Sequence, residues 1–492
     1  METDLLSEPC AVTPRRKTLV SVGTRNIPEL VRQLNEWQYV ERTLHRVMAA
    51  WGRHHAELED KAALHRHVWD QAEIIRRLRD RIEQFPGGKP DAHVHPGFQK
   101  MADIALFAPT FQDALDAVYH ILLRALVRAY ADHVQGASPI HDAPTIALLH
   151  EINTIKEQHY FWYRDYRRRI PHAMDIGYQT KLEQEISSLN GFCNAMPTFI
   201  GQGAPLCGLK TPFFLPKSSA RPKDWRSKYD IMPYLSADFR EDVEARRLFW
   251  AIGYLMEINL PDDQLKWLYY GDQMPWAWHH DVSRHLWDES RHGLSGHSRL
   301  REWGVSVSDV GLPSYDGCCR KIFHESTPVT ERVSDPWLAD ELCDFLAPGS
   351  PMSAQDLYNE IFYIGMVAES GHFAVKNEAY ADFREGRDFE SAEMMLFDII
   401  DETTHVQYAH RWLPELAKLA GFDHAGYRER AARIRADMQK SEIRFAENAR
   451  SLLPRSPQFE PWVHYRNLLA RIRQSIPFNP ELKASLRSYK PM

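Results

Sequence analysis

Helical periodicity constrains this 492-residue chain more than any other feature of its sequence. Apolar and charged residues recur at spacings of three and four, which is the period of an α-helix with one buried face. Almost no stretch alternates between apolar and polar residues as a half-buried strand does. We therefore predict an all-α protein, with long helices over 27–52, 54–84, 110–134, 145–169, 242–259, 263–303, 353–384, 390–421 and 426–453.

Helix-breaking residues divide this pattern into parts. Gly, Pro and Ser cluster in 171–240, which indicates a linker with short helices. A second connection of similar composition covers 304–353, and a bundle in which two helices run parallel needs such a crossover. We predict one helical bundle in 1–170, the linker in 171–240, a second bundle in 241–422, and a final helix with a tail in 423–492.

The bulk composition argues against several classes of protein. The net charge is −7 and the pI is about 6.4, so the chain has no basic footprint for nucleic acid. No apolar run reaches the roughly 20 residues of a membrane span, and the first residues lack the pattern of a signal peptide. The six cysteines show no Cys-x-x-Cys spacing, which is typical of reduced thiols. We therefore expect a cytoplasmic protein that binds neither nucleic acid nor membrane.

The second half of the chain contains three Glu-x-x-His pairs within predicted helices. Residues i and i+3 share a helix face, so the carboxylate and the imidazole of each pair project together. Two facing helices with such pairs, and one Glu from each of two further helices, can hold two metal ions. The pairs are Glu289/His292, Glu369/His372 and Glu402/His405.

Glu257 is the candidate for the remaining carboxylate. It lies in an apolar run, FWAIGYLMEINL, where an unpaired Glu is costly to bury; the alternative is a Glu that faces solvent at a helix end. Glu289 follows Glu257 by 32 residues and Glu402 follows Glu369 by 33, which suits antiparallel helices joined by a short turn. Oxygen-rich ligands with one nitrogen for each ion suit iron or manganese.

These motifs resemble those of the ferritin-like superfamily. Within it they are similar to the di-iron carboxylate oxidases: bacterial multicomponent monooxygenases, ribonucleotide reductase small subunits and acyl desaturases. The resemblance covers roughly residues 242–421 and rests on the boxes Asp288-Glu289-Ser290-Arg291-His292 and Asp401-Glu402-Thr403-Thr404-His405. It implies a ferritin-like four-helix bundle. It also implies that the ligands of the two ions are Glu257, Glu289, His292, Glu369, Glu402 and His405.

The resemblance also assigns residues that orient the ligands. In this family the Asp before the ligand Glu accepts a hydrogen bond from the opposite histidine, which pairs Asp288 with His405 and Asp401 with His292. Arg291 is implied to anchor the two aspartates. Some di-iron N-oxygenases carry an additional histidine four residues before the last ligand Glu. Here that position is Asp398, so this part of the pattern is not matched; we place Asp398 beside the ligands.

His372 departs from the simplest form of the pattern. It follows Glu369 by three residues and is therefore a candidate seventh ligand. The alternative is a histidine that lies beside the ligands or along a channel to them.

The first half of the chain resembles the second with its ligands removed. The segment His67-Val-Trp-Asp-Gln71 matches His285-Leu-Trp-Asp-Glu289, and Ala-Tyr-Ala-Asp occurs at 129–132 and at 379–382. These matches place Gln71, Ile74, Tyr119 and Lys156 where the second half has Glu289, His292, Glu369 and Glu402, whereas His159 matches His405. We predict two ferritin-like bundles in tandem, the N-terminal one degenerate and without metal; the alternative is that the short matches are coincidence.

The resemblance and the ligand set together predict an O2-dependent oxidoreductase. The expected cofactor is two iron ions, with manganese or a mixed manganese–iron pair as the alternative, and O2 is the co-substrate. Hydroxylation, N-oxygenation, desaturation and oxidative cleavage of a small organic molecule all fit. No flavin, nicotinamide or iron–sulfur motif is present, so electrons come from a separate reductase, a small reductant or the substrate. The alternative functions are a metal-storage protein, a dimanganese catalase and an interaction module with a structural metal. The chain could also form a homodimer.

Overall fold

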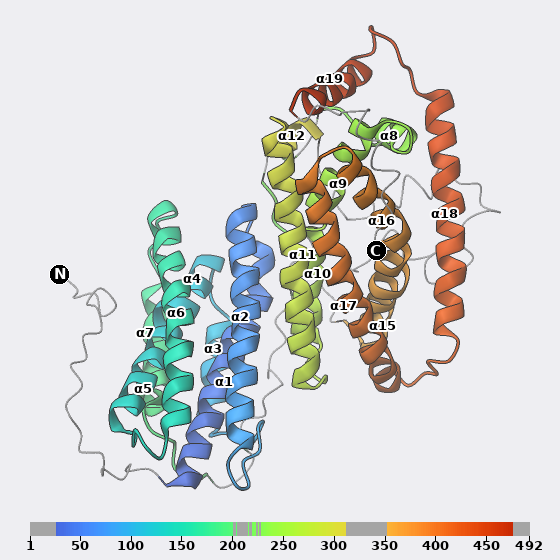
Figure 1. The fold of residues 1–492 in the computed structure, drawn as a ribbon. Helices are drawn as coiled ribbons and strands as arrows, with labels where there is room; N and C mark the ends of the chain where they lie inside the picture. The colour runs from blue at the N-terminus through green and yellow to red at the C-terminus, as the bar shows by residue number, and fades with distance from the viewer. Residues whose placement is uncertain are drawn as a thin grey trace. The chain divides into compact units, whose positions relative to one another are not determined.

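The computed structural model describes residues 26–199, 203, 215, 219–222, 225, 228–310 and 352–475. All regular elements in this part of the chain are helices, so the prediction of an all-α protein is confirmed (Figure 1). None of the described helices is long and apolar enough to cross a membrane.

The chain divides into two compact units. The first consists of Met1–His55, Arg66–Leu215 and Asp272–His280, and the second of Ala56–His65, Pro216–Gly271 and Asp281–Met492. The arrangement as two four-helix bundles joined by a linker stays a prediction.

The N-terminal half follows the predicted helices closely and adds short ones between them. The helix predicted over 110–134 is a continuous run of three elements, of which the middle one is a π-helix. The elements are α1 (Ile27–Trp51), η1 (Gly52–His54), α2 (Leu58–Glu83), α3 (Gly97–Leu106), α4 (Phe111–Leu115), η2 (Asp116–Leu122), α5 (Leu123–Gly136), α6 (Ala143–Arg169), α7 (Ile176–Ser188) and η3 (Asn190–Phe192).

The C-terminal half contains the helices that carry the predicted ligands. The segment predicted over 263–303 breaks before Pro275, a residue that disrupts helices, and the segment over 353–384 again contains a π-helix. The elements are α8 (Met232–Asp238), α9 (Val243–Met256), α10 (Asn259–Tyr270), α11 (Trp276–Glu302), α12 (Val307–Val310), α15 (Ala354–Ile361), η6 (Phe362–Glu369), α16 (Ser370–Glu385), α17 (Phe389–Ala420), α18 (Tyr427–Leu452) and α19 (Glu460–Ser475).

Side chains at the helix ends explain where several helices begin and end. Asp242 accepts hydrogen bonds from the first backbone N–H groups of α9, and Asp388 accepts one at the start of α17. These carboxylates satisfy N–H groups that have no partner within the helix. At the other end of α17, Gly421 has φ +78°, the left-handed conformation that commonly ends a helix.

Apolar side chains hold together the helices that carry the predicted ligands. Trp250 and Tyr254 of α9 pack with Phe383 of α16 and Met395 of α17 in one buried cluster. A larger cluster joins α8, α9, the C-terminal part of α11 and α19. At Gly365 an added Cβ would lie 2.5 Å from the Ala409 Cβ, so only glycine allows η6 to approach α17 this closely. The helices are thus fixed by packing that does not depend on the polar residues between them.

Two predictions fall partly or wholly outside the described residues. The crossover predicted over 304–353 lies mostly outside them, as do all cysteines except Cys193. Within the described part, the predicted C-terminal tail contains a further helix, α19, whose residues Leu468, Leu469 and Ile472 are buried in the larger cluster. The prediction missed this helix because Pro457 precedes it and Pro461 lies in its first turn, so the proline-rich sequence SPQFEP indicated a tail.

Candidate metal centre

Helix α11 presents three potential ligands on one face. His285, Glu289 and His292 are separated by four and three residues, so their side chains project from the same side of the helix. All three are buried. Asp288 and Arg291 stand immediately before Glu289 and His292 and point toward the neighbouring helix α17.

The other ligand candidates come from three more elements. Glu369 is the last residue of the π-helix η6, and π-helices inside α-helices are frequent at functional sites. Glu402 and His405 lie on one face of α17. Glu257 directly follows α9, where it forms the C-terminal cap of that helix.

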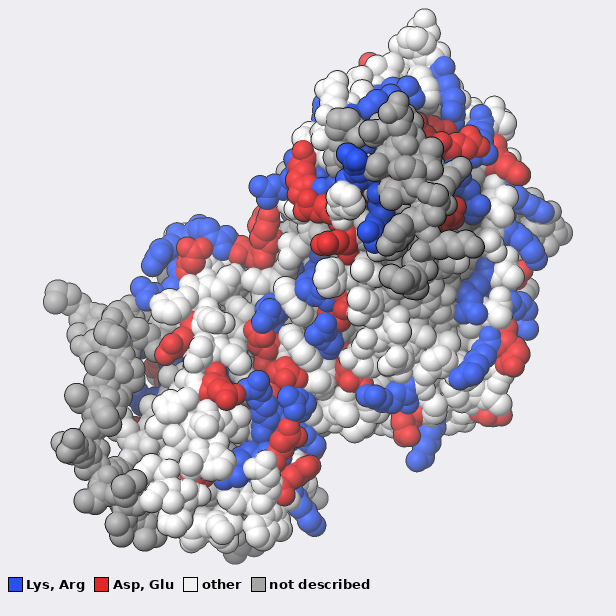
Figure 2. Space-filling model, in the orientation of Figure 1, with Lys and Arg blue, Asp and Glu red and all other residues white. Residues whose placement is uncertain are grey.

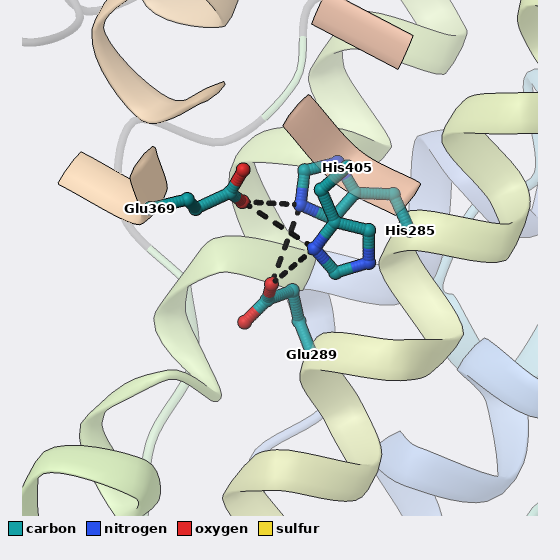
Figure 3. Close-up of side chains that lie close together, drawn as sticks. All are labelled: His285, Glu289, Glu369 and His405. Carbon is teal, nitrogen blue, oxygen red and sulfur yellow. Dashed lines mark hydrogen bonds and ion pairs between the residues drawn. The ribbon is translucent and has the colours of Figure 1, made fainter. Parts of the chain in front are cut away.

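Four of these side chains converge in a first group, shown in Figure 3. The Glu369 Oε1 atom lies 2.8 Å from the His285 Nε2 atom and 3.5 Å from the His405 Nδ1 atom. The Glu289 Oε1 atom lies 3.3 Å from each of the same two nitrogens. The two imidazole rings stack with centroids 3.6 Å apart. This group therefore offers two carboxylates and two imidazoles within reach of one ion.

A second group forms around His292. Its Nδ1 atom lies 3.2 Å from the Glu257 Oε2 atom, 3.5 Å from the Glu289 Oε2 atom and 3.5 Å from the Asp398 Oδ1 atom. Glu402 also offers an oxygen within reach of Glu289 and His292. Glu289 thus belongs to both groups, with one oxygen facing each.

The side chains of the two Asp-Glu-x-x-His boxes cross between α11 and α17. The His405 Nε2 atom lies 3.4 Å from Asp288 Oδ2, and the His292 Nε2 atom lies 3.3 Å from Asp401 Oδ2. The Arg291 guanidinium donates to both aspartates, at 2.6 Å to Asp401. An Nε2–H donated to a carboxylate leaves the Nδ1 lone pair directed at the cluster, as a metal ligand requires.

Unpaired buried atoms show that this donor set fits metal ions. The ligand candidates contain buried oxygens and nitrogens that make no hydrogen bond, whereas buried polar groups in proteins nearly always make one. Divalent cations bound in the two groups would satisfy these atoms. These atoms are Glu257 Oε2, both Glu289 oxygens, His292 Nδ1, Glu369 Oε2, Asp398 Oδ1, Glu402 Oε2 and His405 Nδ1.

The carboxylates and imidazoles strongly affect each other's protonation. Burial alone would raise the pKa of Glu289, but the imidazoles of His285, His292 and His405 beside it hold its pKa well below the usual value. Burial would lower the pKa values of His292 and His405, but the surrounding carboxylates raise them well above the ordinary value. Protons therefore hold this cluster together without a cation, and a metal ion would have to displace them.

The structure adds residues that sequence reasoning missed. His285 precedes Glu289 by four residues and also occurs in the matching N-terminal segment, so helical spacing could have identified it. Lys376 follows Glu369 by seven residues and is buried against Glu402 and Asp398. Asp398 was expected beside the ligands, yet its Oδ1 atom lies in the second group. His372 is exposed and is in neither group.

The corresponding region of the N-terminal unit contains a hydrogen-bond network. The Lys156 Nζ atom lies 2.7 Å from Glu41 Oε2 and 3.3 Å from Gln71 Oε1, and Tyr130 donates to Glu41 at 2.6 Å. His159 contacts Asp70, as His405 contacts Asp288 in the other unit. Here the Lys156 ammonium pairs with the Glu41 carboxylate, and both side chains are fully buried.

One further group of potential ligands lies in the N-terminal unit. Asp113, Asp116 and His172 approach each other closely enough to reach one ion. Their atoms already have partners, because His172 contacts Asp113 at 3.0 Å and Tyr163 donates to Asp116 at 2.6 Å. This group is therefore a weaker candidate than the cluster on α11 and α17.

Compared with family models, with curated proteins and with solved structures, the chain has no match. The buried cluster of histidines and glutamates is therefore the feature from which function must be argued.

Proposed function

We propose that this protein is an O2-dependent non-heme di-iron oxidase or oxygenase that acts on a small organic molecule. The observation that carries the proposal is the convergence of unpaired, buried carboxylate oxygens and imidazole nitrogens from four helical segments. Such a set is expensive to fold without a cation, and its composition suits iron or manganese rather than zinc or magnesium.

The two groups support a pair of ions rather than one. His285, Glu369 and His405 would hold the first ion, and Glu257, His292 and Asp398 the second. Glu289 belongs to both groups, and Glu402 lies within reach of His292 and 3.8 Å from His405. Two ferrous ions in such a site supply the electrons for the reduction of O2 and thereby the oxidant for an organic substrate. Manganese, or a mixed manganese–iron pair, would fit the same ligands.

The surrounding residues have defined tasks in this proposal. Asp288 and Asp401 fix the tautomer and direction of His405 and His292, and Arg291 holds the two aspartates in place. Burial of the cluster excludes bulk water, which strengthens electrostatic interactions within it. Orientation of the ligands and exclusion of water are therefore the contributions of the chain itself.

We also propose that the N-terminal unit is a diverged copy of the metal-binding unit. The buried network around Glu41, Gln71 and Lys156 lies where the sequence match places the lost ligands. The π-helices η2 and η6 give independent support, because π-helices are rare and these contain the matched residues Tyr119 and Glu369. The role of this unit in the proposal is structural.

In this proposal the protein acts on a small organic substrate and needs a source of electrons. On the face shown in Figure 2, Lys and Arg side chains are interspersed with Asp and Glu, as the net charge of −7 leads one to expect. This mixed charge favours a small substrate over a polyanion such as nucleic acid. An external reductase, a small reductant or the substrate itself would supply electrons.

Anaerobic loading with Fe(II) followed by rapid mixing with O2 tests the proposal. We expect about two ions for each chain, the number of ligand groups in the cluster. We also expect a transient visible absorption whose decay changes with the true substrate, and mass spectrometry should detect added oxygen or lost hydrogen in the product. Iron uptake far beyond two ions without organic product would indicate storage. Rapid peroxide dismutation by the manganese form alone would indicate a catalase.

A further inference from the structure

Lys376 brings a positive charge into the metal centre. Its side chain on α16 is 2% exposed, and its Nζ atom lies 2.7 Å from Asp398 Oδ2 and 2.7 Å from Glu402 Oε1. A fully buried lysine is rare, and it is costly unless it is paired. Both carboxylate partners lie on α17, and both belong to the candidate metal-binding groups.

Each of these carboxylates directs one oxygen toward Lys376 and the other toward the candidate ligands. Asp398 Oδ2 accepts from Lys376 and also from the Tyr254 hydroxyl at 2.8 Å, whereas Asp398 Oδ1 is buried without a hydrogen bond. Glu402 Oε1 accepts from Lys376, whereas Glu402 Oε2 is buried without a hydrogen bond. The unpaired Asp398 oxygen lies 3.5 Å from His292 Nδ1, and the unpaired Glu402 oxygen lies 3.8 Å from His405 Nδ1.

We propose that Lys376 is a positioning residue of the metal centre, which holds Asp398 and Glu402 so that each presents a single oxygen to the ions. By its charge it also weakens binding of the ion beside His292. This inference rests on the proposed metal binding, but it concerns a residue that no metal-binding motif in the sequence contains.

The charges in the cluster support this role. Two divalent ions leave one negative charge uncompensated among the five carboxylates Glu257, Glu289, Glu369, Asp398 and Glu402. The Lys376 ammonium supplies the missing positive charge, so the buried centre is neutral when both ions are bound. Asp288 and Asp401 are separately compensated by Arg284 and Arg291.

A Co(II) titration of the full chain under anaerobic conditions tests the inference without an activity assay. Lys376→Met removes the ammonium but keeps an unbranched side chain. We expect this variant to bind two Co(II) ions, the second about tenfold more tightly than in the wild type, because a repelling charge is lost. Its ligand-field absorption should weaken, because freed carboxylates can chelate with both oxygens and raise the coordination number.

The chain offers a matched control for the loss of a buried lysine. Lys156 is fully buried and paired with Glu41 in the other unit, so Lys156→Met removes the same kind of interaction. Its Co(II) titration should equal that of the wild type. If Lys376→Met does not fold, Lys376→Gln keeps a hydrogen-bond donor without the charge and should show the same tighter binding.

The outcomes separate this inference from the proposed function. If the wild-type chain binds neither Co(II) nor Fe(II), the proposed metal centre is refuted. A wild type that binds two ions, with unchanged affinity and spectrum in both neutral variants, would overturn only the role of Lys376. Weaker binding in a folded Lys376→Met variant would also overturn it, since the ammonium would then serve only to keep the ligands assembled.

Discussion

Glu289 is the residue whose replacement tests the two-ion geometry most directly. It is fully buried, and its two oxygens face different groups: Oε1 faces His285 and His405, and Oε2 faces His292. Glu289→Gln keeps the volume of the side chain but removes the anionic ligand from both groups. We expect both metal dissociation constants to rise about 100-fold, which is about 2.7 kcal/mol for each ion.

The consequence for stability follows from the linkage of binding to folding. An ion present at 100 times its dissociation constant stabilises the folded state by about 2.7 kcal/mol, so two independent ions contribute about 5.4 kcal/mol. At the same metal concentration the two weakened sites of Glu289→Gln would contribute only about 0.8 kcal/mol together. For a domain of this size, the loss lowers the metal-induced rise in Tm by roughly 10–18 °C.

Variants of Glu257 and Glu369 provide the comparison, because each belongs to only one group. Glu257→Gln and Glu369→Gln should each retain one tight ion and about 3.1 kcal/mol of metal-dependent stability. Calorimetry with and without Mn(II) or anaerobic Fe(II), and metal analysis after dialysis, measure these differences. His172→Ala, which changes the separate group of the N-terminal unit, should leave the result unchanged. If Glu289→Gln loses no more than the other two variants, Glu289 is not shared between two ions.

Three further predictions concern single residues. Asp401→Asn should weaken metal affinity or activity by about 10–100-fold, because it removes the carboxylate that orients His292, and wild-type values would contradict this role. Glu402→Ala should abolish O2-dependent turnover but leave a helical protein by circular dichroism, because packing comes mainly from apolar burial; full turnover would exclude it as a ligand. Burial raises the pKa of Glu36 from 4.5 to about 8, so between these values the folded chain binds the extra proton and the free energy of unfolding falls as pH rises. Urea denaturation between pH 5 and 8 should show a smaller decrease in the free energy of unfolding for Glu36→Gln than for the wild type. An unchanged dependence of this free energy on pH would contradict the role of Glu36.

Much of the fold could be predicted because helix formation is local. The break before Pro275 and the end of α17 at Gly421 are both readable from a few neighbouring residues. The predicted helices differ from the structure where the backbone conformation depends on packing between distant segments. The π-helices η2 and η6 have no signal in the sequence alone, and α19 is held by contacts with α8 and α9 far away in the chain.

The candidate site shows the same division. Spacing within one helix identified Glu289 with His292 and Glu402 with His405, because residues three apart share a face in any α-helix. Spacing also could have identified His285 and Lys376, but nothing in a single helix says which residues on that face meet a partner. Spacing made His372 a candidate and left Lys376 unnoticed. Only the packing of α16 against α17 buries Lys376 against Glu402 and leaves His372 exposed.

The sequence by itself determined the helices, the face of each helix that carries carboxylates and imidazoles, and their order along the chain. These depend on the helical repeat and on interactions over a few residues. The tertiary structure alone decided that His285 joins the first group and that Asp398, which was expected beside the ligands, joins the second. It also decided that Glu289 faces two groups and that Lys376 is buried between Asp398 and Glu402. Such contacts depend on the rotation and spacing of helices against one another, which long-range side-chain packing sets.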